Sequence, residues 1–258
     1  MLLIFSAYAF VFVFGAAIGS FLNVCIFRLP ANASIVRPLS QCPQCHSPIR
    51  FYDNIPLVSY LILQGKCRDC QGKISWRYPL VEFITALLAV LLFAKFHLTL
   101  NFLIYFIFTA VLIVITFIDL DHQIIPDVLT LPGIPVFFLL AVFVVQIPWM
   151  EAAIGLLIGG GVLLAIALAY EFITKREGMG GGDIKLLAMI GGFLGWKSLI
   201  FILLFSSLLG AVVGITAMVI KKQDMKYAVP FGPFLSAAAV AYLFWGDAFM
   251  EFLLIRGG

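Results

Sequence analysis

The sequence predicts an all-α polytopic membrane protein of about eight transmembrane helices, with a small zinc-binding insert after the first helix. Hydrophobic residues make up 63% of the 258 residues and charged residues only 11%, whereas soluble domains carry about a quarter charged residues. The mean hydropathy is +1.13. Apolar segments recur along the chain, and four of the five cysteines lie in one polar section.

The first apolar segment, residues 2–27, is uncharged and exceeds the roughly 20 residues that a transmembrane helix needs. It lacks a basic start and continues past signal-peptide length, so we expect a first transmembrane helix over residues 1–27 that is not removed. The polar section 28–78 follows, with several prolines and both C-x-x-C pairs. Residues 79–258 form the rest of the predicted transmembrane region.

Seven further apolar segments predict the remaining spans, at residues 79–96, 100–118, 128–147, 152–173, 186–194, 199–220 and 229–254. The segment 186–194 is the shortest and supplies the sixth span. At a rise of about 1.5 Å per residue it crosses only if its flanks extend it or the bilayer thins locally.

The basic residues indicate the orientation. If eight spans alternate and the section 28–78 lies inside, the inner segments carry 13 of the 16 Lys and Arg residues, and the outer side keeps Lys95, Lys197 and Arg256. This is the positive-inside pattern, and it predicts an outer N-terminus and a cytoplasmic cysteine section. It also supports eight spans, because removal of the sixth would move the three lysines of residues 221–226 outside.

Two carboxylates lie at the predicted cytoplasmic boundary. Asp119 ends the third span, and Asp183 opens the sixth after residues 178–182, of which four are glycine. Such acids are costly in a membrane and are functional candidates, although a flexible loop with an Asp helix cap explains Asp183 equally well by itself. Two carboxylates held close share a proton, so one can act as a base on water and the other as an acid. This is the chemistry of aspartic proteases.

Neighbouring acids offer alternatives. Asp119 and Asp121 lie about 200° apart on a helix and cannot face the same partner. Asp119 follows the apolar segment directly and is expected to lie deepest, which leaves Asp121 as the alternative catalytic residue. Asp121 and Asp127 are interpreted as solvated or capping residues. Glu82 is interpreted as a first-turn acid that the helix dipole favours.

The polar section carries two C-x-x-C pairs, Cys42 with Cys45 and Cys67 with Cys70, separated by 21 residues. This spacing predicts a tetrahedral structural zinc site with four thiolate ligands, and a metal would stabilise a section too short to bury a core of its own. His46 could replace one thiolate. Redox chemistry of the thioredoxin type is disfavoured because no βαβ pattern surrounds the pairs, and a reducing cytoplasm disfavours disulfides.

Several motifs occur in the order typical of one family. The run Gly180-Gly181-Gly182-Asp183 matches the G-x-G-D motif of membrane aspartyl proteases, and its setting, Glu177 to Leu186, resembles the type IV prepilin peptidases. Blocks similar to the same family occur at residues 19–30, 77–82, 119–127 and 230–234. The resemblance implies that Asp119 and Asp183 are the catalytic pair of a peptidase core over residues 79–258, with motif support from Gly180, Gly182 and Lys185.

The resemblance further implies a bifunctional enzyme of the bacterial inner membrane. It would cleave the leader of membrane-embedded type IV prepilins or type II secretion pseudopilins on the cytoplasmic side, and then N-methylate the new N-terminal residue with S-adenosylmethionine. The cysteine section, residues 19–30 and Glu82 are the expected location of methyl transfer, but no motif identifies the residues that bind the methyl donor. The glycine-rich backbone beside Asp183 is expected to pair with an unwound substrate strand.

Two alternatives remain open. A peptidase of this type without methyl transfer would carry the same aspartates. A proton-coupled transporter would also use carboxylates within the membrane, but transporters tend to show internal repeats, and the two halves of this chain are unlike. The net charge of +3 is too small to indicate nucleic acid as a partner, and the sequence predicts no oligomeric state.

Overall fold

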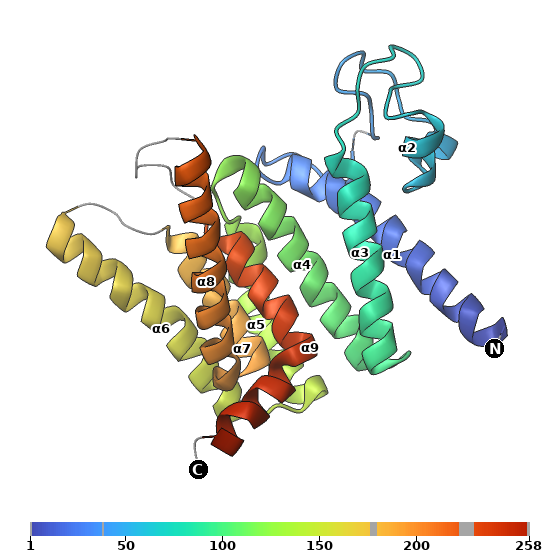
Figure 1. Cartoon of the computed structure of the whole chain (residues 1–258). Coiled ribbons are helices and arrows are strands. Elements are labelled where there is room, and N and C mark those ends of the chain that lie inside the picture. The colour runs from blue at the N-terminus through green and yellow to red at the C-terminus, as the bar shows by residue number, and fades with distance from the viewer. Residues whose placement is uncertain (1, 38, 176–179, 222–229, 257–258) are drawn as a thin grey trace. The chain divides into compact units, whose positions relative to one another are not determined.

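The computed structural model describes residues 2–37, 39–175, 180–221 and 230–256 (Figure 1). These residues form helices and, apart from two isolated β-bridges, no strands. The α-helices are α1 (Leu2–Arg28), α2 (Val58–Ile62), α3 (Arg77–Phe96), α4 (Leu100–His122), α5 (Asp127–Leu140), α6 (Trp149–Thr174), α7 (Gly181–Leu194), α8 (Trp196–Lys221) and α9 (Gly232–Arg256). A 3₁₀ turn, η1 (Phe51–Asn54), precedes α2, and a π-helical turn, η2 (Ala141–Val145), follows α5.

Seven of these helices are long and apolar enough to cross a membrane, namely α1, α3, α4, α5 with η2, α6, α8 and α9. The prediction of an all-α polytopic membrane protein is therefore confirmed. The predicted sixth span corresponds to α7, whose 14 residues fall below the length of the other seven.

The chain divides into two compact units, Met1–Val114 and Ile115–Gly258, with the boundary inside α4. The boundaries predicted from the sequence lie elsewhere, before residues 28 and 79. In the first unit α1 and α3 pack against each other. Glycines allow this close approach, because a Cβ on Gly15 would lie 2.8 Å from Ala86 Cα, and one on Gly19 would lie 2.7 Å from Glu82 Cα.

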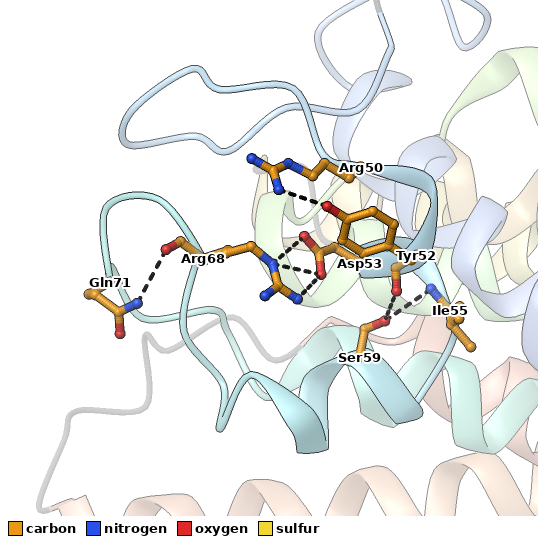
Figure 2. Close-up of polar contacts among 7 residues, drawn as sticks. All are labelled: Arg50, Tyr52, Asp53, Ile55, Ser59, Arg68 and Gln71. Carbon is orange, nitrogen blue, oxygen red and sulfur yellow. Dashed lines mark hydrogen bonds and ion pairs between the residues drawn. The ribbon is translucent and has the colours of Figure 1, made fainter.

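The section between α1 and α3 is held by polar contacts more than by a core (Figure 2). Among its described residues the buried side chains are Cys42 and Ser59. The guanidinium of Arg68 donates to both carboxylate oxygens of Asp53, at 2.6 and 2.9 Å, and this bond lowers the pKa of the Asp53 carboxyl. The Ser59 hydroxyl donates to the carbonyl of Tyr52 at 2.9 Å. These bonds connect the second C-x-x-C turn and α2 to η1.

In the second unit α7 is the central helix. It packs against α5, α6, α8 and α9, and every residue from Leu186 to Leu194 is buried. A helix that is apolar on all sides is stable when other helices surround it. The contact with α6 is the closest, since a Cβ on Gly159 would lie 2.5 Å from the carbonyl oxygen of Leu187.

The start of α7 lies beside the start of α5, and the end of α7 lies beside the start of α6. In its first turn Lys185 forms a 2.7 Å ion pair with Asp127, where α5 begins. Just past its last residue, a Cβ on Gly195 would lie 3.9 Å from the Cβ of Glu151, where α6 begins. Thus α7 runs parallel to α5 and antiparallel to α6, over about 21 Å at 1.5 Å per residue. This direction is the one that eight alternating spans require.

Replacement of Gly155 by Ala is expected to destabilise the protein by about 1–3 kcal/mol, because the added Cβ would collide with the backbone carbonyl of Gly191 in α7. Thermal unfolding in detergent measures this as a lower melting temperature. The matched control in the same helix is Gly161→Ala, whose Cβ would meet no atom within 4 Å. Equal melting temperatures for the two variants would contradict the close packing of α6 on α7.

Candidate functional site

Asp119 and Asp183 both lie in the second unit, one near the C-terminus of a helix and the other near the N-terminus of a different helix. Asp119 is in the last turn of α4 and Asp183 is in the first turn of α7. The Asp119 residue is 5% exposed, whereas Asp121, two positions on, is exposed. This difference in burial agrees with the depth expected of the acid that directly follows the apolar segment, and it favours Asp119 over Asp121 as the site residue.

The N-terminus of α9 binds the Asp119 carboxylate. The N–H of Gly232, the first residue of α9, donates to Asp119 Oδ2 at 3.1 Å. The first amides of a helix have no partner within it and carry partial positive charge. They therefore stabilise a negative charge that the C-terminal end of α4 alone would disfavour. A Cβ on Gly232 would lie 2.6 Å from the same oxygen, so the contact requires glycine.

Ile125 connects this contact to the glycine run. A Cβ on Gly182 would lie 2.7 Å from Ile125 Cβ, and a Cβ on Gly232 would lie 3.1 Å from Ile125 Cδ1. The residue before Asp183 and the residue that binds Asp119 thus pack on one isoleucine. Asp183 lies within electrostatic reach of the Asp119 carboxylate. The structure therefore brings the two predicted acids together.

Asp183 Oδ1 is buried and has no hydrogen-bond partner among the described residues. Buried carboxylate oxygens are nearly always bonded, and the exceptions in native structures are explained by strain, by a catalytic role or by an unseen water or ion. The backbone N–H of Asp183 donates to the Gly180 carbonyl at 3.2 Å, which starts the helix. An acid pair of this kind can activate water on one side and protonate an oxygen or nitrogen on the other.

The supporting residues of the motif have different environments. Gly182 lies within α7 and packs on Ile125, whereas Gly180 precedes the helix in extended backbone with open space around it. Lys185 is paired with Asp127 and so joins the starts of α7 and α5. Of the two motif glycines, only Gly180 has the backbone form that strand pairing needs. Residues 177–179 of the motif's setting lie outside the described residues.

Gly232 is the site residue that the sequence analysis missed. It lies in the block 230–234 that the family resemblance includes, but nothing local assigns a role to it. The available signal is the sequence Pro-Phe-Gly-Pro-Phe, which marks a helix start on the same predicted side as both acids. The partner of that helix start becomes visible only in the folded unit.

A second cluster lies in the first unit, where the four predicted cysteines converge. The Sγ atoms of all four lie within 4.8 Å of one another, with 3.8 Å between Cys42 and Cys70 and 4.0 Å between Cys45 and Cys67. Four thiolates about 2.3 Å from a zinc ion would lie about 3.8 Å apart. A disulfide would need about 2.05 Å. The residues present therefore fit a tetrahedral metal site.

The two cysteine pairs lie in turns with the same backbone pattern, 25 positions apart. In each turn the N–H of the first cysteine donates to the carbonyl five residues on, at 3.0 and 2.8 Å, and an antiparallel bridge closes the turn. His46 and Gln71 occupy equivalent positions with φ of 58° and 57°. His46 is thus a turn residue outside the thiolate cluster. Separately, hydrogen bonds from Ser47 lower the pKa of the Cys45 thiol to about 6.

One zinc ion per chain is expected in the purified protein, measured by elemental analysis. Cys67→Ser should reduce the bound zinc severalfold, because it removes one of four ligands. The control is His46→Ala, which should keep the metal since His46 lies outside the thiolate cluster. Full zinc in the cysteine variant would contradict the four-thiolate site.

Glu82 differs from its predicted environment. The first turn of α3 contains no acid, because the helix begins at Arg77 and Glu82 lies in the second turn. Its carboxylate is buried and accepts hydrogen bonds from the Leu57 N–H, at 2.7 Å, and from Ser20. The interpretation of Glu82 as a first-turn acid is therefore wrong. The carboxylate joins α3 to α1 and to the segment before α2.

Two family models match the chain. The bacterial peptidase A24 N-terminal domain matches residues 13–96, which include the four cysteines. The type IV leader peptidase family matches residues 106–215, which include Asp119 and Asp183. The two polar clusters of the structure thus fall in two separately matched regions.

Curated relatives match nearly the whole chain. The prepilin leader peptidase/N-methyltransferase of Aeromonas salmonicida is 40% identical over 96% of this chain and 94% of its own length. Proteins of the same name from Pseudomonas aeruginosa and Legionella pneumophila are 38% and 34% identical, over 90% and 96% of this chain and 88% and 94% of their own lengths. No solved structure matches the chain significantly. By this similarity along its length, the chain belongs to the type IV leader peptidase family.

Proposed function

We propose that the protein is an aspartic endopeptidase of the bacterial inner membrane that removes the leader of type IV prepilins or type II secretion pseudopilins. It then N-methylates the new N-terminal residue. The observation that carries the peptidase half is the buried Asp119–Asp183 pair inside the region that the leader peptidase model matches. The names of the relatives support the methyltransferase half.

In the proposed mechanism Asp119 is the base and Asp183 is the acid. The Gly232 N–H and the start of α9 stabilise the ionised form of Asp119. Asp119 removes a proton from water as the water oxygen attacks the scissile carbonyl carbon, while Asp183 gives its proton to the carbonyl oxygen. On collapse of the tetrahedral intermediate the C–N bond breaks and the leaving nitrogen takes the proton from Asp119. The Asp183 carboxylate takes a proton from a hydroxyl of the intermediate as the new carboxyl group forms, so both aspartates return to their starting protonation states.

Substrate must reach this pair as extended chain, because a helix hides its carbonyls in internal hydrogen bonds. The backbone at Gly180, with φ −68° and ψ 137° and no atom near its α-carbon, is suited to pair with such a strand. We assign the strand contact to Gly180. Gly182 instead supports the packing of α7 on Ile125.

The proposed orientation places the N-terminus outside and both acids on the cytoplasmic side. The distribution of basic residues supports it, since 13 of 16 fall on the predicted inner side. The ion pair of Lys185 with Asp127 supports the alternation of eight spans on which this orientation is based, because that alternation puts the starts of α5 and α7 on one side. A prepilin whose apolar helix lies in the membrane would present its leader at this boundary.

Zinc and S-adenosylmethionine are the proposed cofactors. Zinc would be held by Cys42, Cys45, Cys67 and Cys70 and would stabilise a section that buries few apolar side chains. S-adenosylmethionine supplies an electrophilic methyl group on its sulfonium. The four cysteines lie outside the region that the leader peptidase model matches, so we assign the zinc site no part in peptide cleavage.

Asp119→Asn and Asp183→Asn are each expected to reduce leader removal by about 10²- to 10⁴-fold, because each removes one half of the acid–base pair. The assay uses purified protein in lipid with a prepilin substrate. Methyl transfer onto an already cleaved pilin is scored separately and should persist in both variants. Asp121→Asn is the matched control and should cleave normally.

A variant of either aspartate that cleaves at the parent rate would overturn the pairing and would direct attention to Asp121. Loss of methyl transfer together with cleavage would indicate one shared site. Absence of methyl transfer in the parent protein would leave the peptidase-only alternative as the function.

Gly232→Ala is expected to slow leader removal about 10- to 100-fold, since the added Cβ would displace the Asp119 carboxylate or the start of α9. Methyl transfer should be unaffected. The control is Gly214→Ala in α8, where the added Cβ would meet no atom within 4 Å. Parent activity in the Gly232 variant would show that the geometry of this contact does not matter for cleavage.

A further inference from the structure

The first unit contains a cavity of about 260 Å³ that is open on one side and is lined by both polar and apolar residues. One wall is a single face of α1, formed by Ala17, Ser20, Phe21, Val24 and Arg28. The other wall is formed by Ile35, Val36, Leu39 and Ser40 together with Asn54 at the end of η1. All of these residues lie within the region 13–96 of the N-terminal domain model. The proteolytic mechanism uses none of them.

Buried polar contacts behind the cavity fix its walls. Ser20 lines the cavity and bonds to the buried Glu82 carboxylate of α3, which also accepts the 2.7 Å bond from the Leu57 N–H. Asn23, one turn along α1, donates to the carbonyl of Tyr78 at 3.1 Å. The α1 wall is thus held against α3 at two polar points, as a preformed binding site requires.

The opposite wall is held through the same carboxylate. Leu57 has φ of 61° and ψ of −47°, a conformation that a leucine adopts only when its surroundings impose it. The bond from its N–H to Glu82 supplies that constraint. Asn54 lies three residues earlier, so Glu82 fixes the segment that carries Asn54 as well as Ser20 on the facing wall.

The groups that face the cavity match the chemistry of a methyl donor. Arg28 presents a planar guanidinium, which binds carboxylates better than other side chains do. Its Nη1 donates to the Ser34 carbonyl at 2.8 Å, which holds the side chain toward the second wall. The aromatic ring of Phe21 offers a stacking surface, and Ser20, Ser40 and Asn54 offer hydrogen bonds.

We propose that this cavity binds S-adenosylmethionine, with the amino-acid carboxylate of the donor on Arg28 and its sulfonium toward the Ser20 wall that the Glu82 carboxylate supports. The volume lies just below the range of about 300–1,000 Å³ for small-molecule sites, so the adenosine part extends through the open side past Phe21. This proposal rests on the proposed methyl transfer. It assigns that activity to residues of the first unit that share no element with Asp183.

The test titrates the zinc-loaded protein in detergent with S-adenosylhomocysteine, the stable product that keeps the carboxylate and adenosine of the donor. Arg28→Gln should weaken binding about 10- to 100-fold, the loss of one charge-assisted hydrogen-bond pair. The control is Arg37→Gln, which removes the same charge from an exposed residue of the neighbouring segment that does not line the cavity. It should bind like the parent.

A second variant covers the case in which Arg28→Gln fails to fold. Ala17→Leu adds three carbon atoms to the cavity wall and should block binding without removal of any polar contact. Zinc content and leader removal, measured on each variant, verify that both units remain folded.

Hydrogen exchange of the parent protein gives an independent readout. Product binding should protect residues 17–28, Ile35, Val36, Leu39, Ser40 and Asn54, and leave Asp183 and the rest of α7 unchanged. Protection confined to the second unit would place the donor elsewhere.

The possible outcomes distinguish failure of the proposed donor site from failure of the proposed methyltransferase function. Parent-like binding in both Arg28→Gln and Ala17→Leu overturns the cavity as the donor site while methyl transfer stands. A parent protein that neither binds the product nor methylates overturns the methyltransferase half of the proposed function and this inference with it. Weaker binding in both variants with normal leader removal supports the cavity.

Discussion

The hydrogen bond from the Gly232 N–H to the Asp119 carboxylate is the contact on which the second unit depends. A buried acid in the last turn of α4 needs positive potential close by, and the start of α9 supplies it. That contact demands glycine at position 232 and places Ile125 against both Gly232 and Gly182. The position of Ile125 in turn determines how closely the start of α7, and with it Asp183, approaches Asp119. The contacts around this amide thus involve α4, α7, α9 and the segment that carries Ile125.

Two polar clusters in this chain are preorganised by different means. In the first unit two turns of equal backbone geometry each contribute two thiolates, and Arg68 and Asp53 connect one of these turns to the segment before α2. In the second unit, helix ends hold the two aspartates within apolar surroundings, and glycines allow the close contacts between these helices. The separate matches of two family models to these regions agree with this division. Each cluster can be perturbed alone, which is why cleavage and methyl transfer are measured separately.

The sequence predicted what depends on local pattern. Hydropathy located the spans, and the cysteine spacing located the thiolate cluster. The position of Asp119 directly after an apolar segment predicted that it is more buried than Asp121. The sequence could not predict contacts between helices that are distant in the chain. The role of Gly232 depends on the carboxylate it meets, 113 positions away. Glu82 was misassigned because the helix starts two residues earlier than its apolar segment, and because Leu57 and Ser20 turn that position into a buried junction.

The burial of α7 on every side limits how a substrate can approach. Four helices cover the residues from Leu186 to Leu194, so a second transmembrane segment cannot lie alongside α7 and slide past Asp183. Among the described residues of α7, Gly181 is exposed and residues 182–185 are half-buried, so an incoming chain would reach this helix at its start. In the proposed orientation, the cleaved peptide bond would then be the one that lies at the level of Asp183, at a defined distance from the membrane core. Peptide bonds deeper in the bilayer would remain intact whatever their sequence.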